Sequence, residues 1–516
     1  MKAPTAAVQL SCPKQAFKRC FNPKRNYTGE GHTTAVADEL AGPILSDVKS
    51  GGPEVESITK PAASGSDRYL AELAWLGGSS PAIEADVLLE VREGRIEAIG
   101  TTDGRRPGDG VVRLAGLTIP GFANAHSHAF QRALRGRTQG RTRGGDFWSW
   151  RDAMYALAAR LDPDRLFALA RGVYGEMALA GICAVGEFHY LHHDPAGAPY
   201  KDPNAMGDAL VEAASEAGIK LTLLDTCYLR GGFDRPLEGP QKRFGDRSAD
   251  AWAERADSMN VSHGAVVGAA IHSVRAVDPS SMGIVRDWAH GREAPLHVHV
   301  SEQRAENEAC LTATGRTPVE LLESLDILGP MTTVVHATHL TEDDITRLGA
   351  SSTRVCLCPT TERDLADGVG PAGALATAGS PLCLGSDSQA VVDLIEEARA
   401  VELDERLITE RRGHHRAVDL LWAATAGGMG SLGRTGGVLE PGAPADFITI
   451  RLDSPRTAGA GESDALDHVV FAASSADVTD VVIGGRHVVV DGGHVALGDV
   501  GCALEEAIAP LREEQP

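Results

Sequence analysis

Apolar residues recur along this chain in two patterns, short continuous runs and longer stretches with helical spacing. The helical spacing is clear in residues 163–179, where Leu166, Ala170 and Val173 fall three or four positions apart. Eight short runs typical of buried strands alternate with such stretches, at residues 117–125, 183–190, 220–228, 266–273, 295–301, 332–336, 353–358 and 381–385. This order predicts a (β/α)8 barrel, a fold that carries its chemistry at the C-terminal ends of the strands.

Further β patterns flank this body at opposite ends of the chain. The pairs Glu93-Gly94 and Gly484-Gly485 each separate two strand-like runs, and both are hairpin signals. Residues 446–450 form another strand candidate near the C-terminal end. We therefore predict a small composite β-sandwich domain assembled from both chain ends.

The predicted organisation divides the 516 residues into five segments. They are a disordered N-terminal extension rich in Pro, Gly, Ser and Thr (1–66), the two parts of the small β domain (67–118 and 439–500), the metallohydrolase barrel (119–438) and a C-terminal tail (501–516).

The overall charge limits the kinds of molecule that the chain is expected to bind. Lys and Arg number 49 against 71 Asp and Glu, which gives a net charge of −22. Such an acidic chain is not expected to bind nucleic acid or an anionic membrane surface, and no run of about 18 apolar residues predicts a membrane span. A small anionic substrate would therefore need a locally basic pocket.

The nine cysteines are odd in number and scattered, which predicts a reducing compartment, the cytoplasm, rather than a disulfide framework. Cys356-Leu357-Cys358 has no second cysteine pair at ligand spacing, so we interpret it as part of a buried strand.

Histidines two residues apart end two of the predicted barrel strands. His126 and His128 would point to the same face of the first strand, because alternate residues of a strand do so, and two adjacent imidazoles suit a metal ion. In the fifth strand His297 and His299 share a face, but His299 lies nearer the C-terminal end. We therefore select His299 as a ligand and assign His297 to a structural layer below it.

Three more polar residues follow strand ends. Glu302 stands just past the fifth strand, His336 ends the sixth, and Asp387 follows the eighth behind a glycine. Each alone has an ordinary explanation, such as a helix cap or a hydrogen-bonded core residue, but together they predict a metal site. No lysine ends the fourth strand, and Lys220 lies at the wrong end of the third, which favours one metal ion over a lysine-bridged pair. Three histidines and an aspartate suit zinc, with iron as the alternative.

These residues resemble the amidohydrolase superfamily in its single-metal deaminase branch, through Asn124-Ala125-His126-Ser127-His128, the spacing from His299 to Glu302, His336 and Asp387. The resemblance covers about residues 68–500. Within the superfamily the chain is similar to the formimidoylglutamate deiminases, in residues 128–132, 147–151, 186–190, 272–275, 336–339 and 358–362.

The resemblance implies specific roles. The metal ligands would be His126, His128, His299 and Asp387, and the catalytic residues Glu302, His336 and Asp387. His336 would position or deprotonate the attacking water, and Glu302 would pass a proton to the departing nitrogen. The substrate would contact Gln131, Arg151, Tyr190, His272 and Arg275, of which Arg151 is expected in a loop.

The implied reaction is hydrolysis of the amidine of N-formimidoyl-L-glutamate to N-formyl-L-glutamate and ammonia, a step of histidine degradation. Two arginines and a tyrosine suit its two carboxylates, which want charge-assisted hydrogen bonds. The partners expected are therefore this small dianion and a second copy of the chain, in a homodimer.

Two other functions compete with this interpretation. One is a related deaminase that acts on a nucleobase or another amidine, whose pocket should offer aromatic stacking and amide hydrogen bonds instead of two arginines. The other is a non-catalytic scaffold, which should have lost ligands, whereas every ligand position is filled here. The arginine-rich stretch 132–143 is interpreted as a basic lid or a solvated loop and receives no role.

Overall fold

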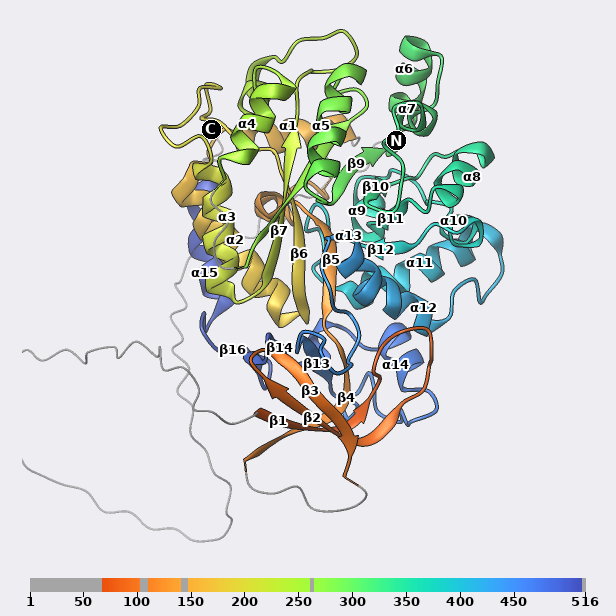
Figure 1. The fold of residues 1–516 in the computed structure, drawn as a ribbon. Helices are drawn as coiled ribbons and strands as arrows, with labels where there is room; N and C mark the ends of the chain where they lie inside the picture. Colours follow the sequence, from red (N-terminus) through yellow and green to blue (C-terminus); the bar gives the residue numbers. More distant parts are fainter. Residues whose placement is uncertain (1–66, 103–109, 141–146, 260–263, 513–516) are drawn as a thin grey trace, which may run out of the picture. The chain divides into compact units, whose positions relative to one another are not determined.

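The computed structural model describes residues 67–102, 110–140, 147–259 and 264–512 (Figure 1). The predicted N-terminal extension, residues 1–66, lies outside the described residues. The rest forms an eight-stranded parallel barrel sheet and a second eight-stranded sheet.

The barrel strands follow one another in chain order around the sheet, each parallel to the next. They are β5 (Phe122–Ser127), β6 (Ile182–His189), β7 (Lys220–Cys227), β8 (Val266–Ser273), β9 (Leu296–Val300), β10 (Thr332–His336), β11 (Arg354–Leu357) and β12 (Leu382–Leu384). The predicted (β/α)8 barrel is thereby confirmed.

The first predicted strand was wrong in its extent. The apolar run 117–125 belongs to two strands, because β4 (Val111–Pro120) lies in the second sheet and β5 begins only at Phe122. Gly121 makes the crossing, and a side chain there would stand 2.2 Å from the sulfur of Cys183. The run appeared continuous in the sequence because both of its halves are buried.

The barrel closes between its first and last strands. Ser127 and Asp387 form an isolated parallel bridge, in which His128 N donates to Asp387 O at 2.9 Å and Asp387 N donates to His126 O at 3.0 Å. Asn124 joins the same seam, because its side-chain oxygen accepts a hydrogen bond from Ser386 N at 2.9 Å. The segments that carry the predicted ligands therefore also complete the barrel.

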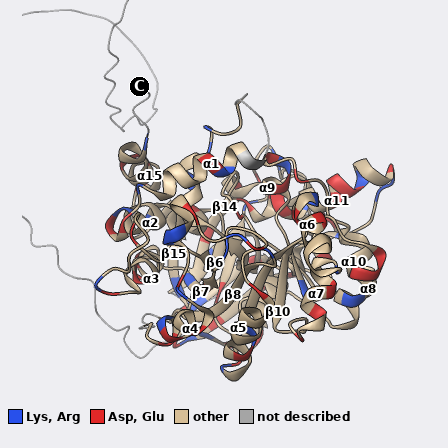
Figure 2. Ribbon diagram, turned by 90° about the horizontal axis from the view of Figure 1, so that it is seen from above, with Lys and Arg blue, Asp and Glu red and all other residues tan. Residues whose placement is uncertain are grey.

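Helices surround the barrel strands (Figures 1 and 2). They are α1 (Phe147–Ala158), α2 (Pro163–Leu179), α3 (Ala205–Ala217), α4 (Ala249–Asp257), α5 (Pro279–Gly291), α6 (Arg304–Thr314), α7 (Pro318–Ser324), α8 (Glu342–Ala350), α9 (Pro359–Asp364), α10 (Ala372–Ala378), α11 (Leu394–Thr409), α12 (Ala417–Trp422) and α13 (Gly428–Ser431). Among the described residues, none of the helices combines the length and the apolar character needed to cross a bilayer.

The second sheet draws its strands from both ends of the chain, as predicted, in the order β16-β15-β14-β13-β4-β1-β2-β3. Its strands, besides β4, are β1 (Asp67–Ala74), β2 (Glu84–Arg92), β3 (Arg95–Thr101), β13 (Phe447–Ile450), β14 (Val478–Ile483), β15 (Arg486–Val490) and β16 (Gly493–His494). The helix between β13 and β14 in the chain, α14 (Ala465–Phe471), packs on α11 and α12. The hydroxyl of Tyr69 donates to Gly485 O at 3.1 Å, and its ring packs on Phe447. The sheet thus folds over an apolar core of its own.

Both predicted hairpin turns are present in this sheet. Glu93 and Gly94 have φ angles of 52° and 77°, and Gly484 and Gly485 have φ angles of 55° and 76°. Positive φ at both central residues is what a two-residue hairpin turn requires. Beyond this sheet, residues of the predicted C-terminal tail form α15 (Val500–Ile508), which packs on α2.

We predict that a methyl group at Gly385, at the barrel seam, destabilises the protein. The new carbon of Gly385→Ala would stand 2.7 Å from the Cβ and 2.9 Å from the carbonyl oxygen of His126. Such overpacking costs about 1–3 kcal/mol, so the thermal melting temperature should fall by about 2–6 °C. Gly283→Ala on α5 is the control, because nothing lies within 4 Å of its new carbon. Equal melting temperatures for the two variants would contradict the crowding at the seam.

Candidate functional site

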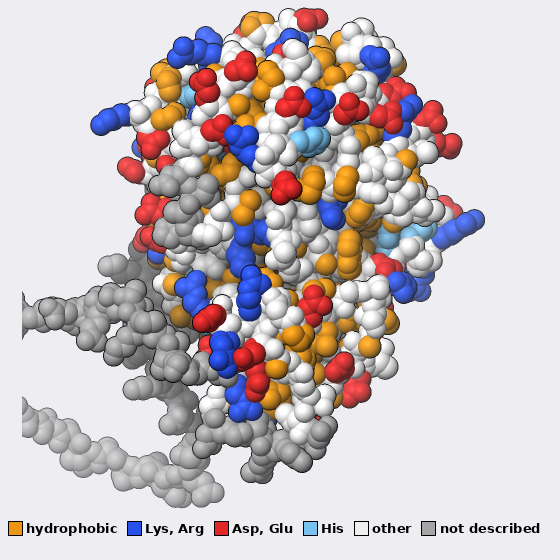
Figure 3. Space-filling view, in the orientation of Figure 1, with side chains coloured by type: hydrophobic (Ala, Val, Ile, Leu, Met, Phe, Trp, Pro, Cys, Tyr) orange, Lys and Arg blue, Asp and Glu red, His pale blue; other side chains and the backbone are white. Residues whose placement is uncertain are grey.

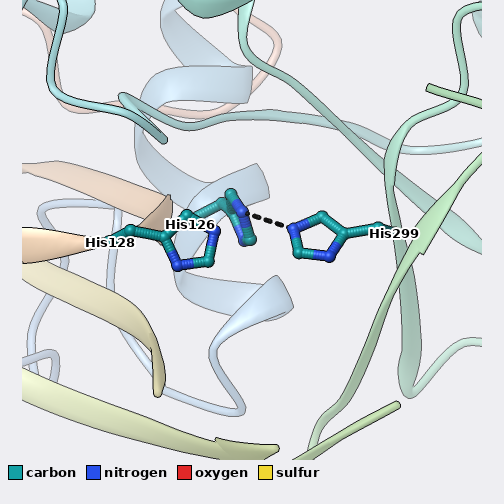
Figure 4. A group of neighbouring side chains, drawn as sticks. All are labelled: His126, His128 and His299. Atoms are coloured by element: carbon teal, nitrogen blue, oxygen red, sulfur yellow. Dashed lines mark hydrogen bonds between the residues drawn. The ribbon is translucent and has the colours of Figure 1, made fainter. Parts of the chain in front are cut away.

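Three imidazoles converge at the C-terminal end of the barrel (Figure 4). His126 is the penultimate residue of β5, His128 directly follows that strand, and His299 stands near the end of β9. The Nε2 atoms of His126 and His299 are 3.1 Å apart, and the three side chains are buried or nearly so. Together they form a group whose ligand atoms all lie within 4.8 Å of one another.

Asp387 supplies an oxygen beside these nitrogens. Its Oδ1 lies 3.4 Å from His126 Nε2 and 3.3 Å from His128 Nε2. The residue has a φ of 42°, an unusual conformation for a non-glycine residue, which turns the chain sharply after β12. Burial alone would raise the pKa of the Asp387 carboxyl, but the hydrogen bond from His126 and the neighbouring imidazoles together outweigh burial and hold this pKa well below its usual range.

The protonation of the imidazoles fits metal coordination. The Nδ1 atoms of His128 and His299 lie 3.0 Å from Phe188 O and 2.9 Å from His272 O, which leaves each Nε2 free to face the others. Burial lowers the pKa of His128 to about 3 and also lowers the pKa of His299, so both rings are neutral at pH 7. Neutral imidazoles with converging Nε2 atoms and one carboxylate form a donor set that fits a divalent ion.

His336 stands next to this group, between carboxylates. Its Nε2 lies 3.7 Å from Asp387 Oδ2 and 3.9 Å from Glu302 Oε1, and its Nδ1 lies 3.4 Å from Glu362 Oε1. Burial alone would lower the pKa of His336, but Glu302 and Glu362 outweigh it and raise the pKa to about 10. Burial raises the pKa of Glu302. An imidazole and a carboxyl group that can exchange protons therefore flank the donor set.

A cavity opens onto these residues. Its lining includes all five predicted substrate contacts, together with aromatic side chains of α1 and the neighbouring loops. Gln131 Nε2 donates to the Tyr190 hydroxyl at 3.1 Å, and the ring of Tyr190 packs against His128. The structure thus brings into one cavity residues that are far apart in the sequence.

The two arginines reach the cavity from different elements. Arg275 follows β8, and its Nε donates to the buried carboxylate of Glu306 at 3.1 Å. Arg151 lies on helix α1, which corrects the prediction that it stands in a loop. His272 is the penultimate residue of β8, and its ring packs against Tyr228.

Several residues that were considered as metal ligands from the sequence lie outside the donor set. The Nε2 of His297 is 2.9 Å from Ser431 O, below the donor set, and Lys220 pairs with Asp446 at the opposite end of the barrel. Cys356 is buried in β11 and Cys358 directly follows it. Cys358 stands within ligand distance of His336 and Glu362, but burial raises the pKa of its thiol and disfavours the thiolate that a metal needs.

Ion pairs neutralise part of the positive charge of the arginine-rich stretch, residues 132–143. Arg132 and Arg135 both pair with Glu176 on α2, at 2.7 Å and 2.5 Å. Arg141 and Arg143 lie outside the described residues. Acidic and basic side chains are interspersed on the face drawn in Figure 3. The described part of this stretch thus includes ion pairs within the protein.

Three buried glutamates hold residues of the site in place, and none of the three was predicted from the sequence to have a role. Glu187 on β6 accepts hydrogen bonds from Ser127 Oγ at 2.6 Å and Ala129 N at 2.7 Å, which fixes the chain on both sides of His128. Glu306 holds Arg275, and Glu362 faces His336. The only signal for Glu187 was a charged residue inside an otherwise apolar strand. Glu306 and Glu362 lie on helices, where glutamate is ordinary.

The sequence matches the Amidohydrolase family over residues 117–488. The chain belongs to this family. An amidohydrolase relative, the formimidoylglutamate deiminase of Pseudomonas aeruginosa, is 37% identical over 398 residues, which cover 75% of this chain and 87% of that protein. The 8-oxoguanine deaminase of Pseudomonas aeruginosa is 30% identical over 393 residues, covering 73% of this chain and 83% of that protein.

Solved structures agree with this assignment. An amidohydrolase from Brucella melitensis superposes with a TM-score of 0.79 at 33% identity, over 86% of this chain and 99% of that one. As an amidohydrolase related to deiminases, the protein is a hydrolase that acts on carbon–nitrogen bonds.

We predict that His299, and not His297, is needed to hold a metal ion. The two histidines share one face of β9, but only His299, which lies nearer the C-terminal end of the strand, belongs to the group of donors. His299→Gln should reduce the metal content of the purified protein, measured by plasma mass spectrometry, by about tenfold or more. His297→Gln can still donate to Ser431 O and should keep its metal. A His299→Gln protein with the full metal content would contradict this ligand assignment.

Proposed function

We propose that this amidohydrolase hydrolyses N-formimidoyl-L-glutamate to N-formyl-L-glutamate and ammonia, as in histidine degradation. The observation that carries the proposal is one cavity lined both by His128, His299 and Asp387 of the donor set and by the side chains of Arg151 and Arg275. The 37% identity to the formimidoylglutamate deiminase of Pseudomonas aeruginosa supports the same substrate.

The proposed cofactor is one divalent ion held by His126, His128, His299 and Asp387. Mixed nitrogen and oxygen donors suit zinc, with iron as the alternative. When bound, the ion supplies Lewis acidity, which makes water a competent nucleophile near neutral pH.

The residues around this donor set would transfer the protons of the reaction. In the proposed reaction, water adds to the formimidoyl carbon and the bond from that carbon to the terminal nitrogen breaks. The positive charge of a bound ion would offset the carboxylates that raise the pKa of His336, so the imidazole, opposite Asp387 and Glu302, would orient the water and accept a proton from it. Glu302 would pass a proton to the departing nitrogen, which leaves as ammonia. The carbonyl oxygen of the product comes from water, so atoms and charges balance.

Substrate recognition would rest on the opposite wall of the cavity. Arg275 is oriented by the buried carboxylate of Glu306, so its guanidinium is preorganised for a substrate carboxylate. Arg151 lines the same cavity from α1. Gln131, Tyr190 and His272 would supply hydrogen bonds near the amidine, since each stands beside the donor set. A dianionic amidine matches this division into a metal side and a cationic side.

A nucleobase deaminase is the second candidate, because the 8-oxoguanine deaminase of Pseudomonas aeruginosa is 30% identical. The cavity also carries the aromatic side chains of Tyr155, Tyr228 and Phe244, which could contact a base. A neutral base, however, carries no carboxylate with which Arg151 and Arg275 could form charge-assisted hydrogen bonds.

The decisive experiment is ammonia release from N-formimidoyl-L-glutamate, measured beside 8-oxoguanine, guanine, cytosine and adenosine. We expect turnover of N-formimidoyl-L-glutamate alone, because only this compound pairs with both arginines. A metal chelator should abolish the activity, and zinc should restore it. Preferential turnover of a base would overturn the proposed substrate, and full activity in metal-free protein would overturn the cofactor.

Glu302→Gln should lower kcat about 10²–10⁴-fold, since the amide keeps the shape of the side chain but cannot carry a proton to the leaving nitrogen. Its metal content should stay unchanged, because Glu302 is outside the proposed donor set. Glu308→Gln, at an exposed position of α6, should behave like the unmodified protein. Normal turnover in Glu302→Gln would rule out the assigned role.

A further inference from the structure

A second cavity adjoins the catalytic cavity. Both cavities are lined by Arg151 and Arg275. These two side chains therefore stand in the wall between the cavities. The other lining residues come from the loop after β7 and from the segment that begins α6, and they are Gly231, Gly232, Phe233, Arg235, Gln303, Ala305, Glu306 and Ala309.

The lining of this outer cavity is basic within an acidic protein. It contains three arginines and one carboxylate, Glu306, although the chain as a whole has a net charge of −22. The carboxylate of Glu306 is already occupied, since it accepts hydrogen bonds from Arg275 Nε and Ser301 N, each at 3.1 Å. The outer cavity therefore offers an anion more positive than negative charge.

Arg235 and Arg230 belong to the same loop but differ in their partners. Arg230 lies 3.4 Å from Asp278 and 4.0 Å from Asp234, so its charge is compensated, and it is not part of the cavity lining. Arg235 is exposed, and no carboxylate of the described residues stands within 4.0 Å of its guanidinium. Its charge is therefore available to a ligand.

The loop that carries Arg235 is anchored to the residue after Arg275. The backbone N–H groups of Leu229 and Arg230 both donate to Ala276 O at 2.9 Å. Within the loop, Gly231 N donates to Arg235 O at 3.0 Å, and Arg235 N donates to Gly232 O at 3.1 Å. These bonds hold the outer arginine in a fixed relation to the segment that bears the inner one. Small residues on both sides, such as Gly232 and Ala305, leave space between them.

We propose that the outer cavity is a capture site for small dicarboxylates, in which Arg235 makes the first contact and the arginines of the shared wall receive the carboxylate next. This inference rests on the proposed function for the identity of the substrate. An acidic protein repels a dianion at long range, and a basic entrance raises the local substrate concentration and the association rate. Arg235 would act on capture and not on the chemical step.

The test compares Arg235→Gln with Arg230→Gln, two variants that remove the same charge from the same loop. Steady-state rates with N-formimidoyl-L-glutamate are measured at ionic strengths of about 0.01 M and about 1 M, where the screening length is about 30 Å and about 3 Å. Arg235→Gln should lower kcat/KM about threefold or more at low ionic strength and have little effect at high ionic strength, with kcat unchanged. Arg230→Gln should change kcat/KM much less, because it is not in the cavity lining.

Equal effects of the two variants, or a loss in Arg235→Gln that persists at high ionic strength, would overturn the capture site. A second experiment tests the capture site independently of the proposed function. Calorimetry measures the binding of the dianion N-acetyl-L-glutamate and of the monoanion N-acetyl-L-glutamine, neither of which needs to be turned over. A protein that turns over no N-formimidoyl-L-glutamate contradicts the function. The capture site still requires that Arg235→Gln weaken binding of the dianion more than binding of the monoanion, and equal weakening would overturn it.

Discussion

The fold and the site depend on the same seam, where the first barrel strand meets the turn after the last one. Two backbone hydrogen bonds cross it, from His128 N to Asp387 O and from Asp387 N to His126 O. These two bonds fix the backbone positions of three of the four proposed ligands, His126, His128 and Asp387, relative to one another. Because closure of a parallel barrel satisfies the edge groups of both terminal strands, the bonds that stabilise the fold also bring the donor atoms together.

Charged side chains act at two places in this protein, around the imidazoles and along the wall of the cavity. Around the imidazoles, buried carboxylates determine which nitrogens carry protons, as Glu362 and Glu302 do for His336. Beyond them, Arg275 and Arg151 line the wall of the cavity against an overall acidic background. Burial strengthens both effects, because unpaired charges are costly in a low-dielectric interior and each group is therefore held by a specific partner.

The sequence predicted the donor set better than its surroundings. Strand ends and alternate positions are local features, so His126, His128 and Asp387 could be placed without a structure. The supporting glutamates could not. Glu306 looks like an ordinary residue of an exposed helix until the fold brings it to Arg275, 31 positions earlier in the chain. The split of the run 117–125 between two sheets was also hidden, because a hydrophobic pattern reports burial but not which sheet buries the strand.

By itself the sequence determined the order of strands and helices, the two hairpin turns and the kinds of donor atoms at the strand ends. Each of these depends on residues close together in the chain, where backbone geometry and side-chain alternation act directly. Only the tertiary structure decided which carboxylate orients which imidazole, that Arg151 stands on a helix, and that two cavities share a wall of arginines. Those features depend on contacts between segments far apart in the sequence, such as Ser127 with Glu187, and no local pattern encodes such contacts.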